Sequence, residues 1–353
     1  MNSNSLISTE CLLELAWQEG FHRAVVASNI ELEDYLSRLD SLKEEGLLDD
    51  VEYESLVREW QELGGRGTFL LCALSCYRDE PDDLTDDNET HGLIAPFARR
   101  NYYREAVSRL KRVFGKVRER TGLRKRDGRI FCNSRLPEKP IAREAGLGVY
   151  GKNSLLLIRG LGSMFVIAGL YLPLELADKA GPTGRKAIET GNGTFSLCKG
   201  CNACMDACPT GAIVMPGILN EKLCISYISA REVPIPDYMR EKWGKRLYGC
   251  QTCQDVCPHN ANLLVATDTR RGEIGPSVPL KRILQMDRKE VKEMFKGTQM
   301  GLSWVSGVAI LRNAIIASGN SGDRRLLPLL FRFLESKEKT LRESAEWAVR
   351  ILK

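Results

Sequence analysis

Eight cysteines lie between positions 198 and 257, in two groups whose spacing is typical of iron-sulfur proteins. They are Cys198, Cys201, Cys204 and Cys208, then Cys224, then Cys250, Cys253 and Cys257. A proline follows both Cys208 and Cys257. Iron in a 4Fe-4S cluster prefers soft thiolate ligands, and a Cys-x-x-Cys-x-x-Cys turn can place three of them on one cube. Two cubes need eight thiols, so the count and spacing predict two 4Fe-4S clusters.

The pairing of these cysteines follows a rule of two-cluster ferredoxins, in which the fourth cysteine of such a run ligates the other cluster. On that rule the ligands of one cluster are Cys198, Cys201, Cys204 and Cys257. The ligands of the other are Cys208, Cys224, Cys250 and Cys253. The second run departs from the ferredoxin pattern because its expected first cysteine is displaced to Cys224. Other pairings of the eight thiols therefore stay open.

Two other uses of cysteine compete with this interpretation. Zinc would take four thiols at a time in separate knuckles, and disulfides need an oxidising compartment. The interleaved prolines and three-residue gaps favour cubanes over zinc. The chain starts with a polar stretch followed by Glu10 and Glu14, which is not a signal-peptide pattern. We therefore expect metal-bound thiols and a cytoplasmic protein.

The length of 353 residues and the 43% hydrophobic composition allow two or three domains with real cores. The formal net charge of +5 allows a polyanionic partner without requiring one. The most apolar region, 155–174, is interrupted by Arg159 and several glycines, so we expect no membrane span.

The first of the elements that must position the cysteines is the segment 10–64. Its charged faces and apolar spacing predict helix. A glycine-rich turn then leads to a buried strand over 68–76. A basic helix over 103–120 has the composition of a solvated face, with phosphate binding as the alternative. Further strands are expected at 130–132, 155–158 and 164–172. Because strands and helices alternate, an α/β domain is predicted up to about residue 180.

The tail shows an internal repeat, since the sequence around Leu311-Arg312-Asn313-Ala314 is echoed about thirty residues later, from Leu341. Gly319-Asn320-Ser321-Gly322-Asp323 is the expected turn between the helices. Such a repeat is typical of stacked helix pairs of the HEAT kind. The predicted fold class is therefore α+β and multi-domain, with an α/β domain over 1–180, a ferredoxin-like double-cluster module over 181–265 and HEAT-like helices over 275–353.

Four sequence segments carry a resemblance to a known family. They are Ala145-Gly146-Leu147-Gly148-Val149-Tyr150-Gly151-Lys152-Asn153, Cys224-Ile225-Ser226-Tyr227, the run from Tyr248 to Pro258, and Leu311-Arg312-Asn313-Ala314 with Gly319-Asn320-Ser321-Gly322. Together they resemble the epoxyqueuosine reductases, cobalamin-dependent iron-sulfur enzymes, over nearly the whole chain after about residue 60. The implied activity is reduction of the epoxide of epoxyqueuosine in tRNA, the last step of queuosine formation.

The resemblance also implies a base-off cobalamin between the α/β domain and the clusters, which feed it electrons one at a time. The cofactor-binding residues it implies are Phe97, Asn101, Tyr102, Gly151, Lys152, Asn153, Ser226, Tyr248 and Gly249. The HEAT-like tail and the basic surface would hold tRNA. The implied electron donor is a flavodoxin, or a ferredoxin with its reductase.

The chain departs from the family pattern at two places that concern the substrate. Asn133 stands where the family has an aspartate thought to protonate the substrate, in an alignment that needs a one-residue shift before Glu138. An amide keeps a hydrogen bond but has no titratable proton to give. Asn101 likewise replaces an aspartate, and Tyr103 replaces a histidine.

These departures leave two alternatives to epoxyqueuosine reduction. One is a paralogous corrinoid iron-sulfur reductase that acts on a different substrate. The other is a ferredoxin-like electron carrier with no substrate of its own.

Overall fold

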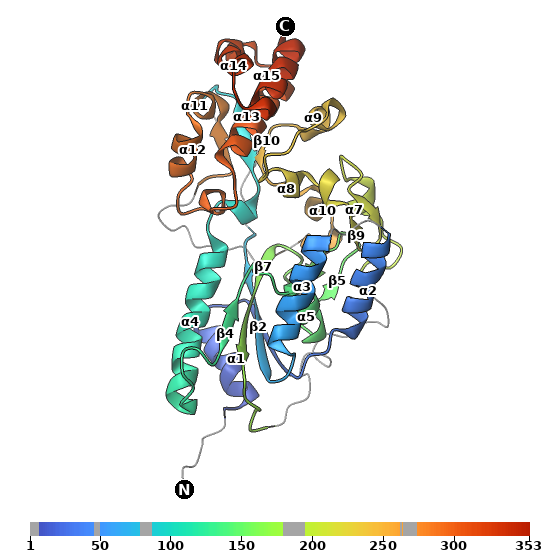
Figure 1. Ribbon diagram of the computed structural model, residues 1–353, viewed down its shortest axis with the longest axis vertical. Coiled ribbons are helices and arrows are strands. Elements are labelled where there is room, and N and C mark those ends of the chain that lie inside the picture. The colour runs from blue at the N-terminus through green and yellow to red at the C-terminus, as the bar shows by residue number, and fades with distance from the viewer. Residues whose placement is uncertain (1–6, 46–49, 78–86, 179–194, 262, 264–273) are drawn as a thin grey trace. The chain divides into compact units, whose positions relative to one another are not determined.

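The computed structural model describes residues 7–45, 50–77, 87–178, 195–261, 263 and 274–353 (Figure 1). The chain forms two compact units. The first comprises Met1–Cys76, Tyr102–Asn202 and Pro258–Leu264, and the second comprises Tyr77–Asn101, Ala203–Cys257 and Val265–Lys353. In the described part of the chain, no helix combines the length and the apolar character that a membrane crossing requires.

The first unit is built on a four-stranded sheet with the order β1-β2-β7-β4. The strands are β1 (Arg23–Ser28), β2 (Thr68–Ser75), β4 (Arg129–Phe131) and β7 (Phe165–Leu172). The helices are α1 (Thr9–Gln18), α2 (Glu33–Glu44), α3 (Asp50–Leu63), α4 (Tyr102–Thr121) and α5 (Glu138–Glu144). Two short strands, β5 (Val149–Tyr150) and β6 (Leu156–Leu157), form a separate hairpin, and η3 (Pro258–Asn260) also belongs to this unit.

Helices cover both faces of this sheet, with α4 on one side and α3 and α5 on the other (Figure 1). Phe69 and Leu71 of β2 pack in one cluster with Trp60 of α3 and Ile141 of α5. All eight residues of β2 are buried, which explains why this strand reads as a continuous apolar run. The predicted strand over 68–76 is thereby confirmed, as is the basic helix, which is α4.

Two expectations about this unit are wrong. The segment expected to be helical from 10 to 64 contains the strand β1, which pairs with β2 from Arg23↔Ala73 to Ser28↔Thr68. The sheet pairs are antiparallel, whereas an α/β domain would have parallel strands. The sequence shows where strands lie but not their direction. The direction is set by the pairing of β2 with β7, which lies far along the chain.

The second unit contains two small sheets, β10-β3-β11 and β8-β9. Its strands are β3 (His91–Ile94), β8 (Ile213–Met215), β9 (Ile218–Leu219), β10 (Arg246–Tyr248) and β11 (Ser277–Pro279). Its helices near the cysteines are η1 (Pro96–Ala98), α7 (Ala203–Asp206), η2 (Glu221–Leu223), α8 (Ile225–Ile228), α9 (Asp237–Trp243) and α10 (Thr252–Asp255). Those of the tail are α11 (Leu280–Leu284), α12 (Arg288–Met294), η4 (Gln299–Gly301), α13 (Gly307–Ser321), η5 (Arg324–Leu326), α14 (Leu327–Leu334) and α15 (Lys339–Leu352).

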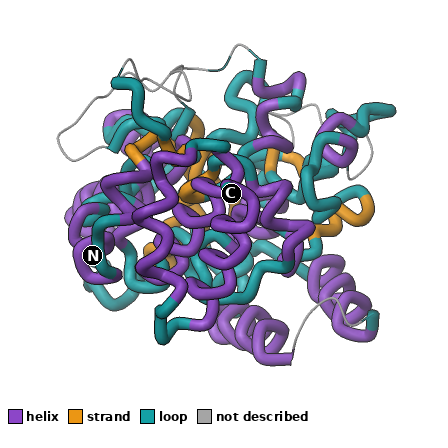
Figure 2. Tube along the Cα trace, turned by 90° about the horizontal axis from the view of Figure 1, so that it is seen from above, coloured by secondary structure: helices purple, strands orange, loops and turns teal. Residues whose placement is uncertain are grey.

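Helix α13 is the centre of this unit, because every residue from Gly307 to Gly319 is buried. The oxygen of Ser306 caps its start by accepting from the backbone N–H groups of Val308 and Ala309. Helices α15, α11 and α12 pack against it, and α14 packs against α15. The chain then ends in helix, with α15 reaching Leu352 (Figure 2).

The predicted turn over 319–323 is wrong in its position. Helix α13 continues through Ser321, and the left-handed residue that ends it is Gly322, at φ 72°. Gly319 lies inside the helix, and a Cβ at this position would be 2.5 Å from the ring of Trp347. Close packing of α13 against α15 therefore requires a glycine at position 319, which does not mark a turn.

Candidate iron-sulfur site

The eight cysteines of the motif lie in turns and at the ends of short helices. Cys204 is in α7, Cys224 is the N-cap of α8, Cys250 follows β10 and Cys253 is in α10. All twelve cysteines of the chain are free thiols, so none is used in a disulfide. Across the described stretches, no three His, Cys, Asp or Glu side chains converge on a single metal ion. A cubane instead spreads its thiolates over four irons.

The four thiols predicted to hold the second cluster are electrostatic neighbours in the second unit. Burial, and to a smaller extent the charges of Cys250, Cys224, Cys204 and Cys208, raise the pKa of Cys253 to about 12. Burial also raises the pKa of Cys224, to which Cys250 and Cys208 add. Without metal, these thiolates repel one another. Iron binding requires their deprotonated forms and supplies the positive charge that such a group needs.

The surroundings of Cys208 stabilise a thiolate. Burial raises its pKa, but N–H groups of Thr210, Ala212 and Ile213 outweigh that effect, so the pKa is lowered overall. The N–H of Ala212 lies 3.2 Å from Cys208 Sγ. The hydroxyl of Thr210 donates to the carbonyl of Leu223, the residue before Cys224. Backbone donors to sulfur are among the features that tune iron-sulfur clusters, so these residues fit one.

The other four predicted ligands divide between the two units. Cys198 and Cys201 belong to the first unit, where the N–H of Cys201 donates to the carbonyl of Cys198 at 2.7 Å. Cys204 and Cys257 belong to the second unit, where α7 packs against α10.

Four of the predicted cofactor-binding residues lie together in the second unit. The rings of Phe97 and Tyr248 have centroids 6.4 Å apart. Gly249 has φ 76°, and a Cβ there would be 2.8 Å from the Phe97 ring. The buried hydroxyl of Ser229 accepts the N–H of Gly249 at 3.1 Å and donates to the carbonyl of Ser226 at 2.9 Å. The structure thus brings Phe97, Ser226, Tyr248 and Gly249 into one patch.

A small cavity of about 120 Å³ opens beside Gly249 and Cys250, with Ala95 and Gln251 in its lining. The side-chain oxygen of Gln251 is buried and has no hydrogen-bond partner. A buried acceptor without a donor costs free energy. It therefore indicates a place for a ligand with N–H groups. This role could not be predicted from the sequence, because Gln251 lies inside the cysteine motif without being a ligand.

The predicted contacts Gly151, Lys152 and Asn153 form a loop of the first unit. The amine of Lys152 donates to the side-chain oxygen of Asn202, next to Cys201, at 2.7 Å. Asn153 is 5% exposed, and its side-chain oxygen accepts the N–H of Leu155 at 3.3 Å. Asn153 therefore holds the loop, and Lys152 connects it to the first cysteine run.

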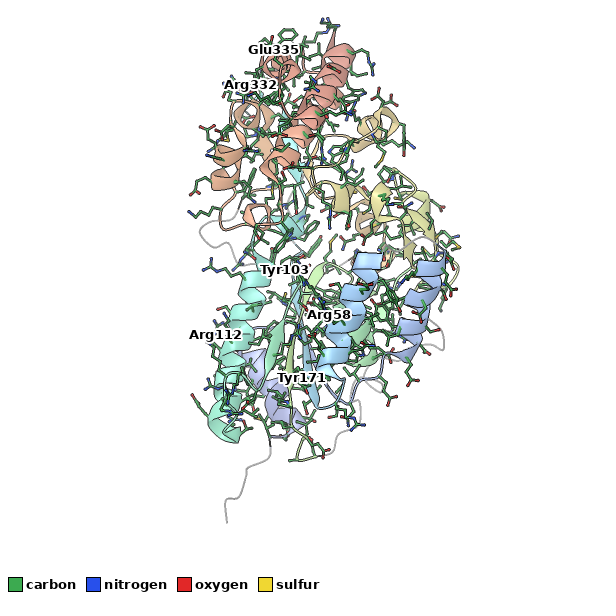
Figure 3. All side chains as sticks on the ribbon, viewed as in Figure 1. Arg58, Tyr103, Arg112, Tyr171, Arg332 and Glu335 are labelled. Atoms are coloured by element: carbon green, nitrogen blue, oxygen red, sulfur yellow. The ribbon has the colours of Figure 1, made fainter. Side chains whose placement is uncertain are left out.

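Asn101 and Tyr102 precede and begin α4. Asn101 is half-buried, whereas Tyr102 is 2% exposed and belongs to the packing of the helix. Farther along α4, Arg112 is 55% exposed and pairs with Glu19 (Figure 3). Burial raises the pKa of Glu19, but hydrogen bonds and charges of Arg112 and Lys116 outweigh it, so the pKa is lowered overall. Glu19 therefore offsets part of the positive charge of this stretch of the basic helix.

Asn133 has φ 49°, in the left-handed region that Asn and Asp tolerate better than most residues. Its N–H donates to one carboxylate oxygen of Glu138 at 2.9 Å, and the N–H of Ser134 donates to the other at 2.7 Å. Burial raises the pKa of Glu138 although hydrogen bonds from Ser134 and Asn133 lower it. Glu138 thus holds the Asn133 turn, a role that the sequence did not reveal.

A family model described as a 4Fe-4S double cluster binding domain matches residues 197–260. Together with twelve free thiols, this match confirms the prediction of iron-sulfur clusters over the zinc and disulfide alternatives. The chain thus contains a 4Fe-4S double cluster binding domain.

The particular family follows from proteins that are similar to well over half of the chain. The epoxyqueuosine reductase of Bacillus subtilis (strain 168) is 34% identical over 218 residues, which cover 61% of this chain and 53% of that protein. The epoxyqueuosine reductase of Alicycliphilus denitrificans is 31% identical over 270 residues, which cover 73% and 71%. The match thus spans about half the length of the first relative and more of the second.

A solved structure of an epoxyqueuosine reductase with a tRNA-Tyr epoxyqueuosine-modified tRNA stem loop shares the fold. It has a TM-score of 0.79 and 28% identity, covering 97% of this chain and 89% of that one. The chain belongs to the epoxyqueuosine reductase family.

Proposed function

We propose that this chain reduces the epoxide of epoxyqueuosine in tRNA and so forms queuosine. The observation that carries the proposal is the similarity, over 97% of the chain, to a reductase solved with a modified tRNA stem loop. In this reaction two electrons and two protons remove the epoxide oxygen as water and leave a carbon–carbon double bond. The clusters deliver single electrons, so two transfers complete each turnover.

The protein residues proposed for electron delivery are the eight cysteines. One cluster would be held by Cys198, Cys201, Cys204 and Cys257, and the other by Cys208, Cys224, Cys250 and Cys253. Cys253 is electrostatically coupled to Cys250, Cys224 and Cys208 of the second set and also to Cys204 of the first, so the coupling supports a group of neighbouring thiols. The electron donor would be a flavodoxin, or a ferredoxin with its reductase, in the cytoplasm.

We also propose cobalamin as the cofactor at which the substrate reacts. In the second unit its contacts would be Phe97, Ser226, Tyr248 and Gly249, and the free acceptor of Gln251 suits the amide N–H groups on a corrin's edge. In the first unit they would be Gly151, Lys152 and Asn153, with Asn101 and Tyr102 on either side of the unit boundary. When bound, reduced cobalamin supplies a strongly nucleophilic metal centre. The protein residues position it and exclude water.

The tRNA would be held through its phosphates and shape by the tail helices and basic side chains. Helices α13 and α15, which pack closely, would be HEAT-like units. The predicted divisions at 1–180, 181–265 and 275–353 would then correspond to the cofactor domain, the cluster module and the tRNA-binding helices.

The test is reduction of epoxyqueuosine in a tRNA stem loop by protein loaded with iron-sulfur clusters and cobalamin. The expected product has lost one oxygen atom, as read by mass spectrometry of the nucleoside. Cys250→Ser should abolish the reaction because it removes a proposed cluster ligand. Cys11→Ser, which lies outside the cysteine motif, should leave it unchanged. No product from the fully loaded protein would refute the substrate assignment.

A second candidate is a paralogous reductase that acts on a different substrate. The observation in its favour is Asn133, whose amide cannot protonate an epoxide oxygen and whose turn is held by Glu138. A double variant, Asn101→Asp with Asn133→Asp, distinguishes the two. If only the double variant is active on tRNA, the paralogue is correct; if the native protein is already fully active, it is not.

A further inference from the structure

Helix α13 carries two adjacent polar side chains, an arginine and an asparagine, in the middle of its buried stretch. Arg312 and Asn313 are both 0% exposed. A buried guanidinium costs free energy unless good acceptors surround it. Arg312 donates to the carbonyls of Arg231 at 2.7 Å, Val233 at 2.8 Å and Ile228 at 3.1 Å. Its guanidinium thus holds the backbone that follows α8.

Asn313 extends the same network to a second backbone segment. Its side-chain oxygen accepts from Arg312 at 2.8 Å, which fixes the orientation of the amide. The amide nitrogen then donates to the carbonyls of Ser229 at 2.8 Å and Leu247 at 2.9 Å. One side chain therefore ties the end of α8 to β10.

These two segments lead directly to proposed cluster ligands. Cys224 is the N-cap of α8, and Cys250 follows Leu247 by three positions along the chain. The hydroxyl of Ser229 adds a second tie between them, because it accepts from Gly249 and donates to Ser226. The five carbonyls bound by Arg312 and Asn313 thus belong to the two pieces of chain that carry Cys224 and Cys250.

We propose that Arg312 and Asn313 are positioning residues for a 4Fe-4S cluster, because they hold the Cys224 and Cys250 segments at the separation that the cluster requires. Ligands that are ordered in advance bind metal without the cost of fixing loose chain. The proposal rests on the double-cluster assignment and holds whatever substrate the enzyme reduces.

The competing interpretation is that this network only stabilises α13. Asn320 separates the two, because it lies on the same helix and makes bonds of the same kind. Its amide donates to the carbonyls of Arg240 at 2.7 Å and Gly244 at 3.3 Å, in a segment without a cysteine. Asn320→Ala therefore removes two backbone bonds, as many as Asn313→Ala, but these bonds hold the last turn of α9 and do not join the end of α8 to β10.

The experiment compares Asn313→Ala and Arg312→Lys with Asn320→Ala after anaerobic reconstitution with iron and sulfide. The iron content of the two test variants should fall from about eight to about four per chain, with loss of one cluster's electron paramagnetic resonance signal. Asn320→Ala should keep both clusters. Because activity on tRNA is not measured, failure of the substrate proposal would not affect the result.

Ser229→Ala is a milder variant for the case in which Asn313→Ala does not fold. It keeps both α13 side chains, and with them the tie made by Asn313, and removes only the second tie, which the Ser229 hydroxyl makes, so it should shift the reduction midpoint of one cluster. The proposal is overturned if these variants show wild-type iron content, spectra and midpoints. It is also overturned if Asn320→Ala loses the same cluster.

Discussion

Gly249, the residue before Cys250, is a position where the backbone and its neighbours both demand glycine. Its φ is 76°, and in that left-handed region an L-residue costs about 1 to 2 kcal/mol. A Cβ would lie 2.7 Å from the Cβ of Ala95 and 2.8 Å from the ring of Phe97, closer than packed carbons allow. Overpacking of this kind costs about 1 to 3 kcal/mol. We therefore expect Gly249→Ala to lower the free energy of unfolding by about 2 to 5 kcal/mol.

Gly322→Ala is the matched control, because Gly322 has φ 72° but nothing within 4 Å of its would-be Cβ. It carries only the backbone cost, about 1 to 2 kcal/mol. Urea unfolding of the metal-free proteins, followed by circular dichroism, measures both values. Reconstituted Gly249→Ala should also bind less iron than Gly322→Ala. Equal destabilisation by the two substitutions would refute the close packing of Gly249 against Ala95 and Phe97.

Three further predictions concern single side chains. Asn133→Asp keeps the left-handed backbone and adds a titratable acid, so the rate of epoxide reduction should rise about 100-fold; an unchanged kcat would contradict proton donation at this position. The hydrogen bond from Arg325 holds the pKa of Asp323 at about 2, below its ordinary value of 3.8. The carboxylate therefore stabilises the fold at neutral pH and stops doing so as pH falls through that range. Asp323→Asn should lower the free energy of unfolding by about 1 kcal/mol at pH 7, and urea titrations should show the difference vanishing between about pH 4 and pH 2. Lys292 donates to three backbone carbonyls, so Lys292→Met should cost about 2 to 3 kcal/mol in urea unfolding. The control Lys296→Met, on an exposed pair, should change stability by less than about 0.5 kcal/mol.

The cysteine motif could be predicted from the sequence because cluster ligation depends on residue type and local spacing. The strand β2 and the helix α4 were also predictable, since each carries a continuous signal of burial or charge. Strand β1 was missed because its six residues lie between helices and are held by pairing with β2. That pairing is a long-range contact, and periodicity does not report such contacts.

The supporting residues of the site could not be predicted for the same reason. Glu138 is recognisable as the partner of the Asn133 turn only from its two hydrogen bonds. Arg312 and Asn313 belong to a motif that is visible in the sequence. The backbone carbonyls of Ser229, Arg231 and Val233, which accept from them, lie some eighty residues away along the chain. A polar pair inside an apolar helix was the available signal. Its meaning depends on which backbone carbonyls the fold brings to it.

The central claim is that electrons pass from the two clusters to the epoxide of epoxyqueuosine in tRNA. The most direct measurement is a single turnover with chemically reduced, cofactor-loaded protein and no further donor, in which queuosine formed is compared with cluster electrons lost. We predict one queuosine for every two electrons removed from the clusters and added to the substrate. Cluster oxidation without queuosine, or unchanged epoxyqueuosine beside fully reduced clusters, would contradict the claim.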